Sequence, residues 1–308
     1  MRLILALLAA FAAAAVSPAA AQAQAQTRTL SLDHDGLTRR AILDAAPGVQ
    51  DAPVLVILHG GIAGPEWMRR RARVGLAREG WAVLYPYAID DWNDGRLDRR
   101  GRRYDDADDL GFLRALIARL DEAGIADPSR VFFAGPSLGG TMVLRILCEA
   151  PELGAGYAVA ISSFPEGEAC RDEDTPRPVL LLHGTADRIM PPEGGRVGGG
   201  SLFVKDRGRV RPVAETAARL ADRNGCEGFD ERAIPDRVTS DESTAALREY
   251  QGCEQPFLHY VVEGAGHTWP GSGQLRLGGS LIGMTNQDFS ATRVVERFFK
   301  ALAATPEG

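Results

Sequence analysis

The sequence has fewer basic than acidic residues: 35 Lys and Arg against 41 Asp and Glu give a formal charge of −6 over 308 residues. A protein that binds nucleic acids in general needs a clustered basic face, so this balance argues against that class. Apolar residues make up 45% of the chain and charged residues 25%, which excludes a disordered or collagen-like chain. The composition therefore predicts a globular protein.

Metal-ligand spacings and long apolar runs are also lacking. The four cysteines form no C-x-x-C pair and the five histidines no H-x-x-x-H pair, so we expect no zinc site and no other metal. After position 16 no apolar run approaches the roughly 20 residues that span a bilayer. We therefore expect no stable membrane anchor.

Residues 1–23 have the pattern of a secretory signal peptide. Arg2 supplies a positive charge, 3–16 is an apolar run, and small residues offer cleavage sites between Ala21 and Ala25. The apolar run is shorter than a membrane span, which disfavours a membrane anchor as the alternative. We therefore expect a secreted or periplasmic protein, and the sequence does not distinguish between these two locations.

The mature chain, residues 24–308, is expected to be a single domain. In an exported protein an even number of cysteines favours disulfides, and four cysteines allow three pairings. We expect the two sequential pairs, which close short loops: Cys148–Cys170 and Cys226–Cys253.

Short apolar runs alternate with helical patterns along this domain. Runs typical of strands that are buried on both faces lie at 53–58, 81–86, 131–135, 158–162, 178–183 and 259–263. Helical spacing of apolar residues predicts helices over 106–120, 140–149, 213–224 and 290–302. An N-terminal hairpin over 28–50 is expected around an Asp35-Gly36 turn. The alternation predicts an α/β fold whose central sheet is mostly parallel, with helices on both faces.

The strongest chemical signal is GPSLGG at 135–140, between an apolar run and a helix. A G-x-S-x-G segment in this context is a tight turn that exposes a nucleophilic serine, here Ser137. Side chains at the flanking glycines would collide, and the turn places Ser137 at a helix N-terminus. The alternative, a surface serine in a glycine-rich turn, fits the flanking strand and helix less well.

A serine hydroxyl needs a base, and the order expected here is serine, acid, histidine. Asp187 follows the fifth strand, and His267 lies in a glycine-rich loop after the sixth. We expect these two to complete a triad with Ser137, although an aspartate in a turn often only bonds local backbone.

The oxyanion donors are expected to be two backbone amides. One is the N–H of Leu138 after the serine, and the other is the N–H of Gly61 in the loop after the first core strand. His59 in that loop is expected to bond loop backbone.

Together these segments resemble the secreted polyhydroxybutyrate depolymerase and feruloyl esterase group, which includes carbohydrate esterase family 1. The motifs that carry the resemblance are HGG at 59–61, DDLGF at 108–112, GPSLGG at 135–140, HGTAD at 183–187 and GHTWPG at 266–271. The resemblance implies the α/β-hydrolase fold and a Ser137–Asp187–His267 triad. It also implies a similar placement of the four cysteines.

The implied function is a serine esterase that hydrolyses feruloyl or acetyl esters of polysaccharide, or hydroxyalkanoate esters, through an acyl-enzyme and without a cofactor. The alternatives are a polyhydroxybutyrate (oligomer) depolymerase proper, a serine peptidase, or a non-catalytic binding protein of the same fold. Little sequence follows the terminal helix, which lowers the expectation of a polymer-binding domain. No partner besides the ester substrate is implied, and the sequence makes no prediction of oligomeric state.

Trp269, Trp92 and Ile62 are expected to contact the substrate, with packing as the alternative for the tryptophans. The Gly- and Arg-rich stretch at 194–211 is predicted to be a surface insertion that reshapes the cleft. The arginines at 96–103 are predicted to lie on a solvated loop.

Overall fold

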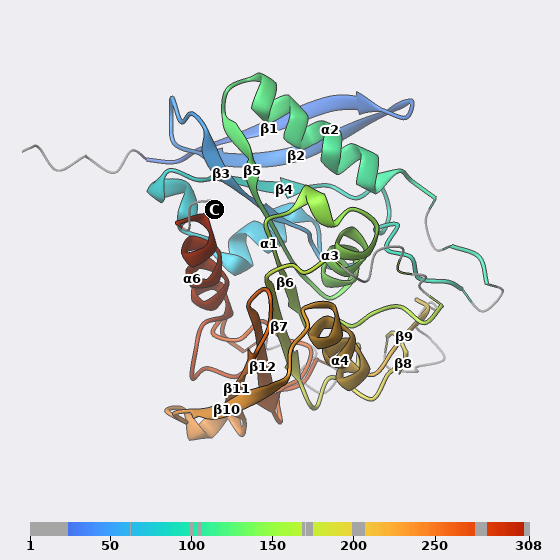
Figure 1. The fold of residues 1–308 in the computed structure, drawn as a ribbon. Helices are drawn as coiled ribbons and strands as arrows, with labels where there is room; N and C mark the ends of the chain where they lie inside the picture. Colours follow the sequence, from blue (N-terminus) through green and yellow to red (C-terminus); the bar gives the residue numbers. More distant parts are fainter. Residues whose placement is uncertain are drawn as a thin grey trace, which may run out of the picture.

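The structure is a computed structural model that describes residues 24–61, 63–98, 101–103, 106–167, 170, 175–198, 207–274 and 282–304. One sheet has ten strands in the order β1-β2-β4-β3-β5-β6-β7-β12-β11-β10 (Figure 1). The strands are β1 (Gln26–His34), β2 (Leu37–Ala45), β3 (Ala52–Ile57), β4 (Ala82–Pro86), β5 (Ala126–Pro136), β6 (Gly156–Ala160), β7 (Val179–Gly184), β10 (Gly228–Ile234), β11 (Thr244–Gln251) and β12 (Phe257–Glu263). A separate two-stranded sheet pairs β8 (Gly195–Arg196) with β9 (Arg209–Val210).

The middle of the large sheet is parallel and its two edges are antiparallel. β4, β3, β5, β6, β7 and β12 run parallel to their neighbours within this block. β1 and β2 extend one edge, and β11 and β10 the other, in antiparallel pairs. The prediction of a mostly parallel α/β sheet is confirmed. The sequence does not predict β10 and β11. The edge strand β10 is almost entirely exposed, and it therefore has no apolar run.

A two-residue turn joins β1 to β2. Asp35 and Gly36 have φ values of 50° and 71°, and a type I′ turn requires positive φ at both positions. The turn sets the register, in which His34 lies opposite Leu37. The expected N-terminal hairpin is therefore present.

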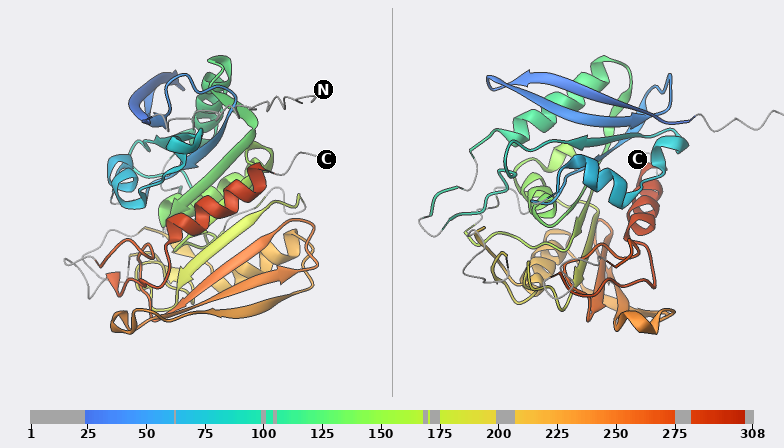
Figure 2. Two further views of the ribbon diagram at one scale, coloured as in Figure 1. Left: turned by 90° about the vertical axis from the view of Figure 1, so that its left-hand side faces the viewer. Right: turned by 180° about the vertical axis from the view of Figure 1, so that it is seen from behind.

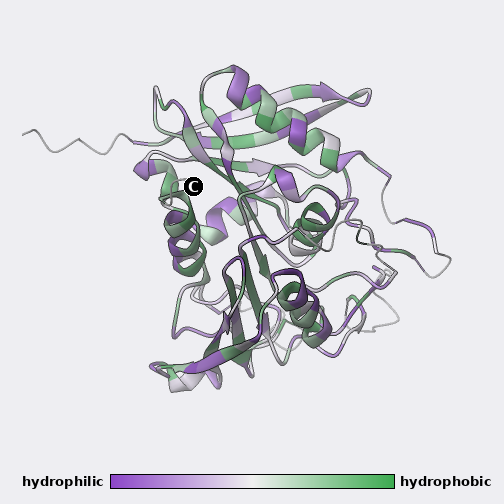
Figure 3. Ribbon diagram, in the orientation of Figure 1, coloured by the Kyte–Doolittle hydropathy of each residue, from purple (hydrophilic) through white to green (hydrophobic). Residues whose placement is uncertain are grey.

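Helices cover both faces of the sheet (Figures 1 and 2). The α-helices are α1 (Pro65–Ala72), α2 (Asp109–Glu122), α3 (Leu138–Glu149), α4 (Val213–Arg223) and α6 (Ala291–Ala303), and the 3₁₀ helices are η1 (Leu76–Glu79), η2 (Pro151–Leu153) and η3 (Thr239–Asp241). Alternate side chains of a strand point to opposite faces. Leu55 and Ile57 of β3 belong to the same apolar cluster as residues of α1 and α6, whereas Val54 and Val56 belong to the cluster that includes residues of α2, α3 and α4. Figure 3 shows the hydrophobic residues concentrated on the central strands between these layers.

Two disulfides are present, and both join sequential cysteines. Cys148, near the end of α3, is bonded to Cys170, and Cys226, after α4, is bonded to Cys253 between β11 and β12. Among the described residues, no helix has the length and apolar character needed to cross a membrane. The expected signal peptide, 1–23, lies outside the described residues.

Candidate active site

Ser137 lies at the sharp turn between β5 and α3. Its φ of 55° and ψ of −127° form a conformation that L residues rarely adopt. A Cβ on Gly135 would lie 2.5 Å from the carbonyl carbon of Gly139, and a Cβ on Gly139 would lie 2.2 Å from the carbonyl oxygen of Leu58. The turn therefore requires glycine at both positions, and it holds Ser137 at the N-terminus of α3.

His267 and Asp187 lie in loops that follow two other strands, and they connect to Ser137 in series. Asp187 lies in the loop after β7, and His267 lies in the loop after β12, the strand next to β7. Nε2 of His267 is 2.9 Å from Oγ of Ser137, and Nδ1 is 2.7 Å from Oδ2 of Asp187. Because a carboxylate only accepts hydrogen bonds, Nδ1 carries the proton and Nε2 faces the serine hydroxyl as an acceptor. Three residues from three loops thus form one hydrogen-bonded chain.

The carboxylate of Asp187 is fixed by its own loop as well. Its Oδ1 accepts the N–H groups of Ile189 and Met190, each at 2.8 Å, and the residue is only 4% exposed. Asp187 therefore bonds both its local turn and the histidine, because one carboxylate oxygen accepts the backbone N–H groups and the other faces His267. The Asp187 carboxylate that accepts from the His267 imidazole is therefore fixed in position by its own loop.

The loop that follows β3 packs against the serine turn. A Cβ on Gly60 would lie 3.4 Å from Cβ of Ser137, and a Cβ on Gly61 would lie 2.3 Å from Cδ1 of Leu138. The Gly60 position is thus in ordinary contact with Ser137, whereas a side chain at position 61 would have to displace the ends of the Leu138 and Arg207 side chains. The Gly61 and Leu138 backbones, expected to supply the oxyanion donors, therefore lie on adjacent segments beside the serine.

His59 anchors this loop. Its Nε2 accepts the Ala88 N–H at 3.2 Å, so Nδ1 carries the proton and donates to the Gly60 carbonyl at 2.9 Å. Burial lowers the pKa of His59, which keeps the ring neutral at pH 7. The histidine bonds loop backbone, as the sequence predicts.

A cavity of about 550 Å³ has Ser137 and His267 in its wall, and this is an ordinary size for a small-molecule site. Trp269 lines it, and its indole N–H donates to Thr292 Oγ1 at 3.0 Å, which holds the ring in place. The exposed lining is mainly apolar. Its residues include Gly60, Gly61, Ala63, Gly64, Trp67, Met68, Pro136, Leu138, Ile161, Ile189, Val197 and Ile282.

Trp92 does not contact this cavity, contrary to the expectation from the sequence. It is 0% exposed, and its indole N–H donates to the carbonyl oxygen of His59 at 2.8 Å. The polar residues around it in the sequence resemble a surface loop, but the ring itself fills the core beneath the His59 loop. Ile62, the other expected contact, lies outside the described residues.

The stretch at 194–211 is not merely a surface insertion. Val197 and Val210 are buried, β8 pairs with β9, and Val197, Gly198 and Arg207 line the cavity. Residues 199–206 lie outside the described part.

The arginine run at 96–103 is only partly solvated. The Arg102 side chain is 69% exposed, but Arg96 is fully buried in an ion pair with Asp94. The expectation of a solvated loop is therefore wrong for Arg96. Residues 99 and 100 lie outside the described part.

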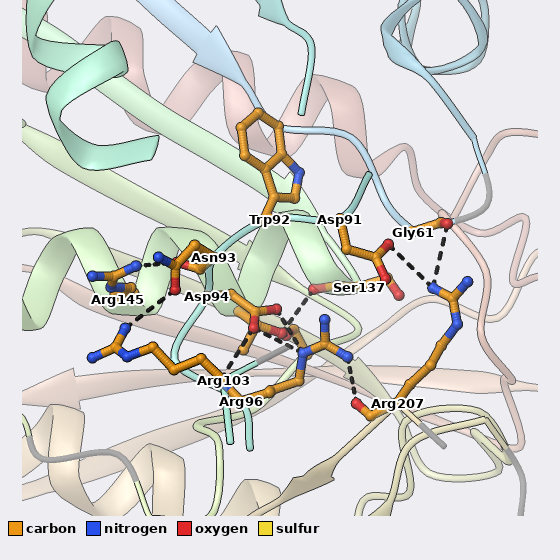
Figure 4. A network of polar contacts seen from close by, with 12 residues as sticks. Gly61, Asp91, Trp92, Asn93, Asp94, Arg96, Arg103, Ser137, Arg145 and Arg207 are labelled. Carbon is orange, nitrogen blue, oxygen red and sulfur yellow. Dashed lines mark hydrogen bonds and ion pairs between the residues drawn. The ribbon is translucent and has the colours of Figure 1, made fainter. Parts of the chain in front are cut away.

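Arg207 connects the cavity wall to the candidate oxyanion loop. Its Nη1 donates to the Gly61 carbonyl at 3.3 Å and lies 3.4 Å from Oδ1 of Asp91. The carbonyl oxygen of Arg207 in turn accepts a hydrogen bond from Arg96. Figure 4 shows this chain from the buried Asp94–Arg96 pair to the Gly61 backbone.

Sequence reasoning missed the contribution of α1, which supplies Trp67, Met68 and Arg71 to the cavity. A signal was present: Pro65 suits the first helical position, and Met68 and Ala72 stand four residues apart, so that both are buried. Among the described residues, no group of three or more His, Cys, Asp or Glu could hold a metal ion.

No family model matches the sequence. The chain is 27% identical over 266 residues to "Putative esterase NocK" of Nocardia uniformis subsp. tsuyamanensis, which covers 83% of this chain and 77% of that protein. It is 31% identical over 171 residues to feruloyl esterase B of Piromyces equi, covering 50% of this chain and 30% of that protein. It is 31% identical over 143 residues to the oxidized polyvinyl alcohol hydrolase of Sphingopyxis sp. (strain 113P3), covering 37% of this chain and 38% of that protein.

The matches agree in chemistry with the serine site and the sheet that carries it. The chain is therefore a carboxylic ester hydrolase with an α/β fold, and it is related by sequence to feruloyl esterases and to an oxidized polyvinyl alcohol hydrolase.

Proposed function

We propose that this serine esterase cleaves its substrates with Ser137 as nucleophile, His267 as general base and Asp187 as the group that orients the imidazole. The observation that carries the proposal is the chain of two hydrogen bonds, 2.9 Å and 2.7 Å long, from Ser137 through His267 to Asp187. His267 takes the hydroxyl proton as Oγ attacks the ester carbonyl carbon, and then gives it to the departing alcohol. Water attacks the acyl-enzyme by the same route and releases the acid.

The Leu138 and Gly61 N–H groups donate to the oxyanion of the tetrahedral intermediate. The close approach of the Gly61 loop to Leu138 and the position of Leu138 at the start of α3 support this assignment. Removing one such donor typically costs about 10²–10³ in rate.

The substrates we propose are feruloyl or acetyl esters of polysaccharide, or hydroxyalkanoate esters. The mainly apolar cavity with Trp67 and Trp269 in its wall suits an aromatic or aliphatic acyl group. A relative named as a feruloyl esterase favours the first of these classes. Export to the periplasm or medium is supported by the signal-peptide pattern and the two disulfides.

The test is a comparison of the mature protein with Ser137→Ala and with Ser129→Ala, an exposed serine on β5 away from the cavity. The panel contains p-nitrophenyl acetate and butyrate, methyl ferulate, acetylated xylan and hydroxybutyrate oligomers, with a peptide amide as the peptidase control. We expect Ser137→Ala to lose at least about 10³-fold in kcat/KM on every ester. Ser129→Ala is expected to match the native protein.

Full activity of Ser137→Ala would contradict the proposed nucleophile. Amide hydrolysis that exceeds ester hydrolysis would instead favour the peptidase alternative. The best ester of the panel identifies the acyl group.

A further inference from the structure

A second cavity, of about 400 Å³, lies beside the first. Arg71 and Trp269 line both cavities, so the two are contiguous. Its wall is formed by the end of α1, the segment after it, the turn after Trp269 and the start of α6. The remaining lining residues are Arg70, Ala72, Arg73, Gly75, Gly271, Ser272, Ser290, Thr292, Arg293 and Glu296. We refer to this set as the arginine cleft.

The arginine cleft is strongly cationic in a protein whose net charge is −6. Among the described residues, four arginines line it against a single carboxylate, that of Glu296, which already accepts the Gly75 N–H at 2.6 Å. Within the described part of the chain, none of these four arginines forms an ion pair with a carboxylate. The nearby Arg69 does so with Asp44, and the comparison shows how the cleft differs from the adjacent surface.

Arg71 occupies the junction of the two cavities. Its Nη2 donates to the Gly273 carbonyl at 2.6 Å, which holds the guanidinium in the wall. Burial and the charge of Arg73 both lower the pKa of Arg71. When the surroundings disfavour the cationic form of an arginine, an anion that binds beside it stabilises that form.

The start of α6 adds to this field. Ser290 is the N-cap of α6, and Thr292 and Arg293 lie in its first turn, where the helix dipole favours negative charge. Thr292 is fixed between the Trp269 indole, from which it accepts, and the Ala72 carbonyl, to which it donates at 2.6 Å. Thr292 therefore links the end of α1, the Trp269 ring and the start of α6 at the boundary between the two cavities.

From this juxtaposition we propose that the arginine cleft binds a carboxylate on the substrate while the ester group lies at Ser137 in the first cavity. This assignment rests on the proposed esterase function and adds a substrate class, namely esters that carry an anionic group remote from the scissile bond. Guanidinium groups match carboxylate oxygens with paired, charge-assisted hydrogen bonds. The carboxylate is either the terminal group of a hydroxyalkanoate oligomer or a uronate on a polysaccharide.

The first experiment measures binding without turnover. In the Ser137→Ala background, isothermal titration compares hydroxybutyrate dimer, trimer and tetramer acids with their C-terminal primary amides. We expect at least one acid to bind about tenfold more tightly than its amide, and the preference to fall in 0.5 M NaCl. The double variant Arg73→Gln/Arg293→Gln should lose the preference for the acid over the amide.

Both substituted arginines are exposed, so their replacement does not disturb the core. Arg78→Gln/Arg297→Gln is the matched control, since these arginines are also exposed, lie on η1 and α6, and are not in the lining of either cavity. The control is expected to keep the preference for the acid.

The second experiment measures kcat/KM with Ser137 intact. One pair is the oligomer acid and its amide, and the other is acetylated glucuronoxylan and the same polymer with its uronates reduced to alcohols. For each pair, the quantity measured is kcat/KM for the anionic substrate divided by kcat/KM for its neutral counterpart. In the double variant Arg73→Gln/Arg293→Gln we expect this ratio to fall about tenfold for the pair whose anion the cleft binds, through a higher KM for the anionic substrate. The responding pair identifies the source of the carboxylate.

Equal affinity for acid and amide in titration, together with equal kcat/KM within both pairs, would overturn the proposed cleft. So would an equal effect of the two double variants. A charge preference in titration without any ester turnover by the Ser137 protein would support the cleft and contradict the esterase function, so the two failures are distinct.

Discussion

Arg96 and Asp94 form an ion pair in which both side chains are 0% exposed, with Nε of Arg96 2.7 Å from Oδ2 of Asp94. Arg96 also donates to the backbone carbonyl of Arg207, whose guanidinium reaches the Gly61 loop. A buried charge pair therefore supports one wall of the candidate active-site cavity.

Replacing Arg96 should be costly because it leaves the Asp94 carboxylate buried without its cation. We expect Arg96→Met to lower the free energy of unfolding by about 3–5 kcal/mol, measured by urea denaturation. Arg102→Met is the control, because its partner Asp98 lies in an exposed pair, which should contribute about 0–1 kcal/mol. An equal decrease in the free energy of unfolding in both variants would show that the buried Asp94–Arg96 pair contributes no more to stability than the exposed pair.

The serine turn should not tolerate a methyl group. A Cβ on Gly139 would lie 2.2 Å from the Leu58 carbonyl oxygen, so Gly139→Ala must shift the turn and lose activity along with about 1–3 kcal/mol or more of stability. Gly228→Ala is the matched control, since nothing lies within 4 Å of a Cβ there. Thermal unfolding and p-nitrophenyl butyrate hydrolysis measure the two effects. An active, stable Gly139→Ala protein would refute the close approach.

Two tryptophans should respond in opposite ways. Trp67 is 39% exposed and lines the cavity, so we expect Trp67→Ala to raise KM for the best aromatic ester about tenfold with stability changed by about 0.5 kcal/mol or less. Trp92 is buried and bonded to the His59 carbonyl, so Trp92→Phe should cost about 1–3 kcal/mol of stability through the lost hydrogen bond. If KM instead responds to Trp92 and not to Trp67, the cavity wall is wrongly assigned.

Acid should destabilise the fold through His183 and His259. Their rings lie in contact inside the protein, with His183 Nδ1 2.9 Å from His259 Nε2. Burial lowers the pKa of His183 from 6.5 to about 4 and lowers the pKa of His259 as well. The unfolded chain therefore binds protons that the native state excludes, so stability decreases as the pH falls from 6.5 towards 4. The loss from His183 alone is about 3 kcal/mol.

The measurement is urea denaturation between pH 8 and pH 4 on the native protein and on His183→Leu/His259→Phe. We expect the double variant to have a flatter pH dependence below 6.5, where the native rings resist protonation. Both proteins should show the same slope between pH 7 and 8. Parallel curves over the whole range would exclude a contribution from the histidine pair.

The parallel core and the serine turn were predictable because their signals are local. Apolar runs mark strands that are buried on both faces, and the two glycines around Ser137 record a steric need within one turn. The same holds for the Asp35-Gly36 turn, whose positive φ values depend on two residues alone.

The misassigned residues depend on distant partners. Arg96 occurs in a run of arginines, and only the folded neighbourhood of Asp94 and the Arg207 carbonyl makes its burial favourable. Trp92 stands among polar residues but is covered by the His59 loop, more than 30 residues earlier in the chain. β10 is missed for the opposite reason, because an exposed edge strand needs no apolar pattern.

The chain of hydrogen bonds at Ser137 joins residues that are 80 and 130 positions apart. Their loops follow β5, β7 and β12, so the bonds form only after the C-terminal strand β12 has docked beside β7. Long-range strand pairing is a slow step in folding. Recovery of ester hydrolysis in a refolding experiment should therefore lag behind the return of secondary structure, so that turnover reports when β12 has docked beside β7.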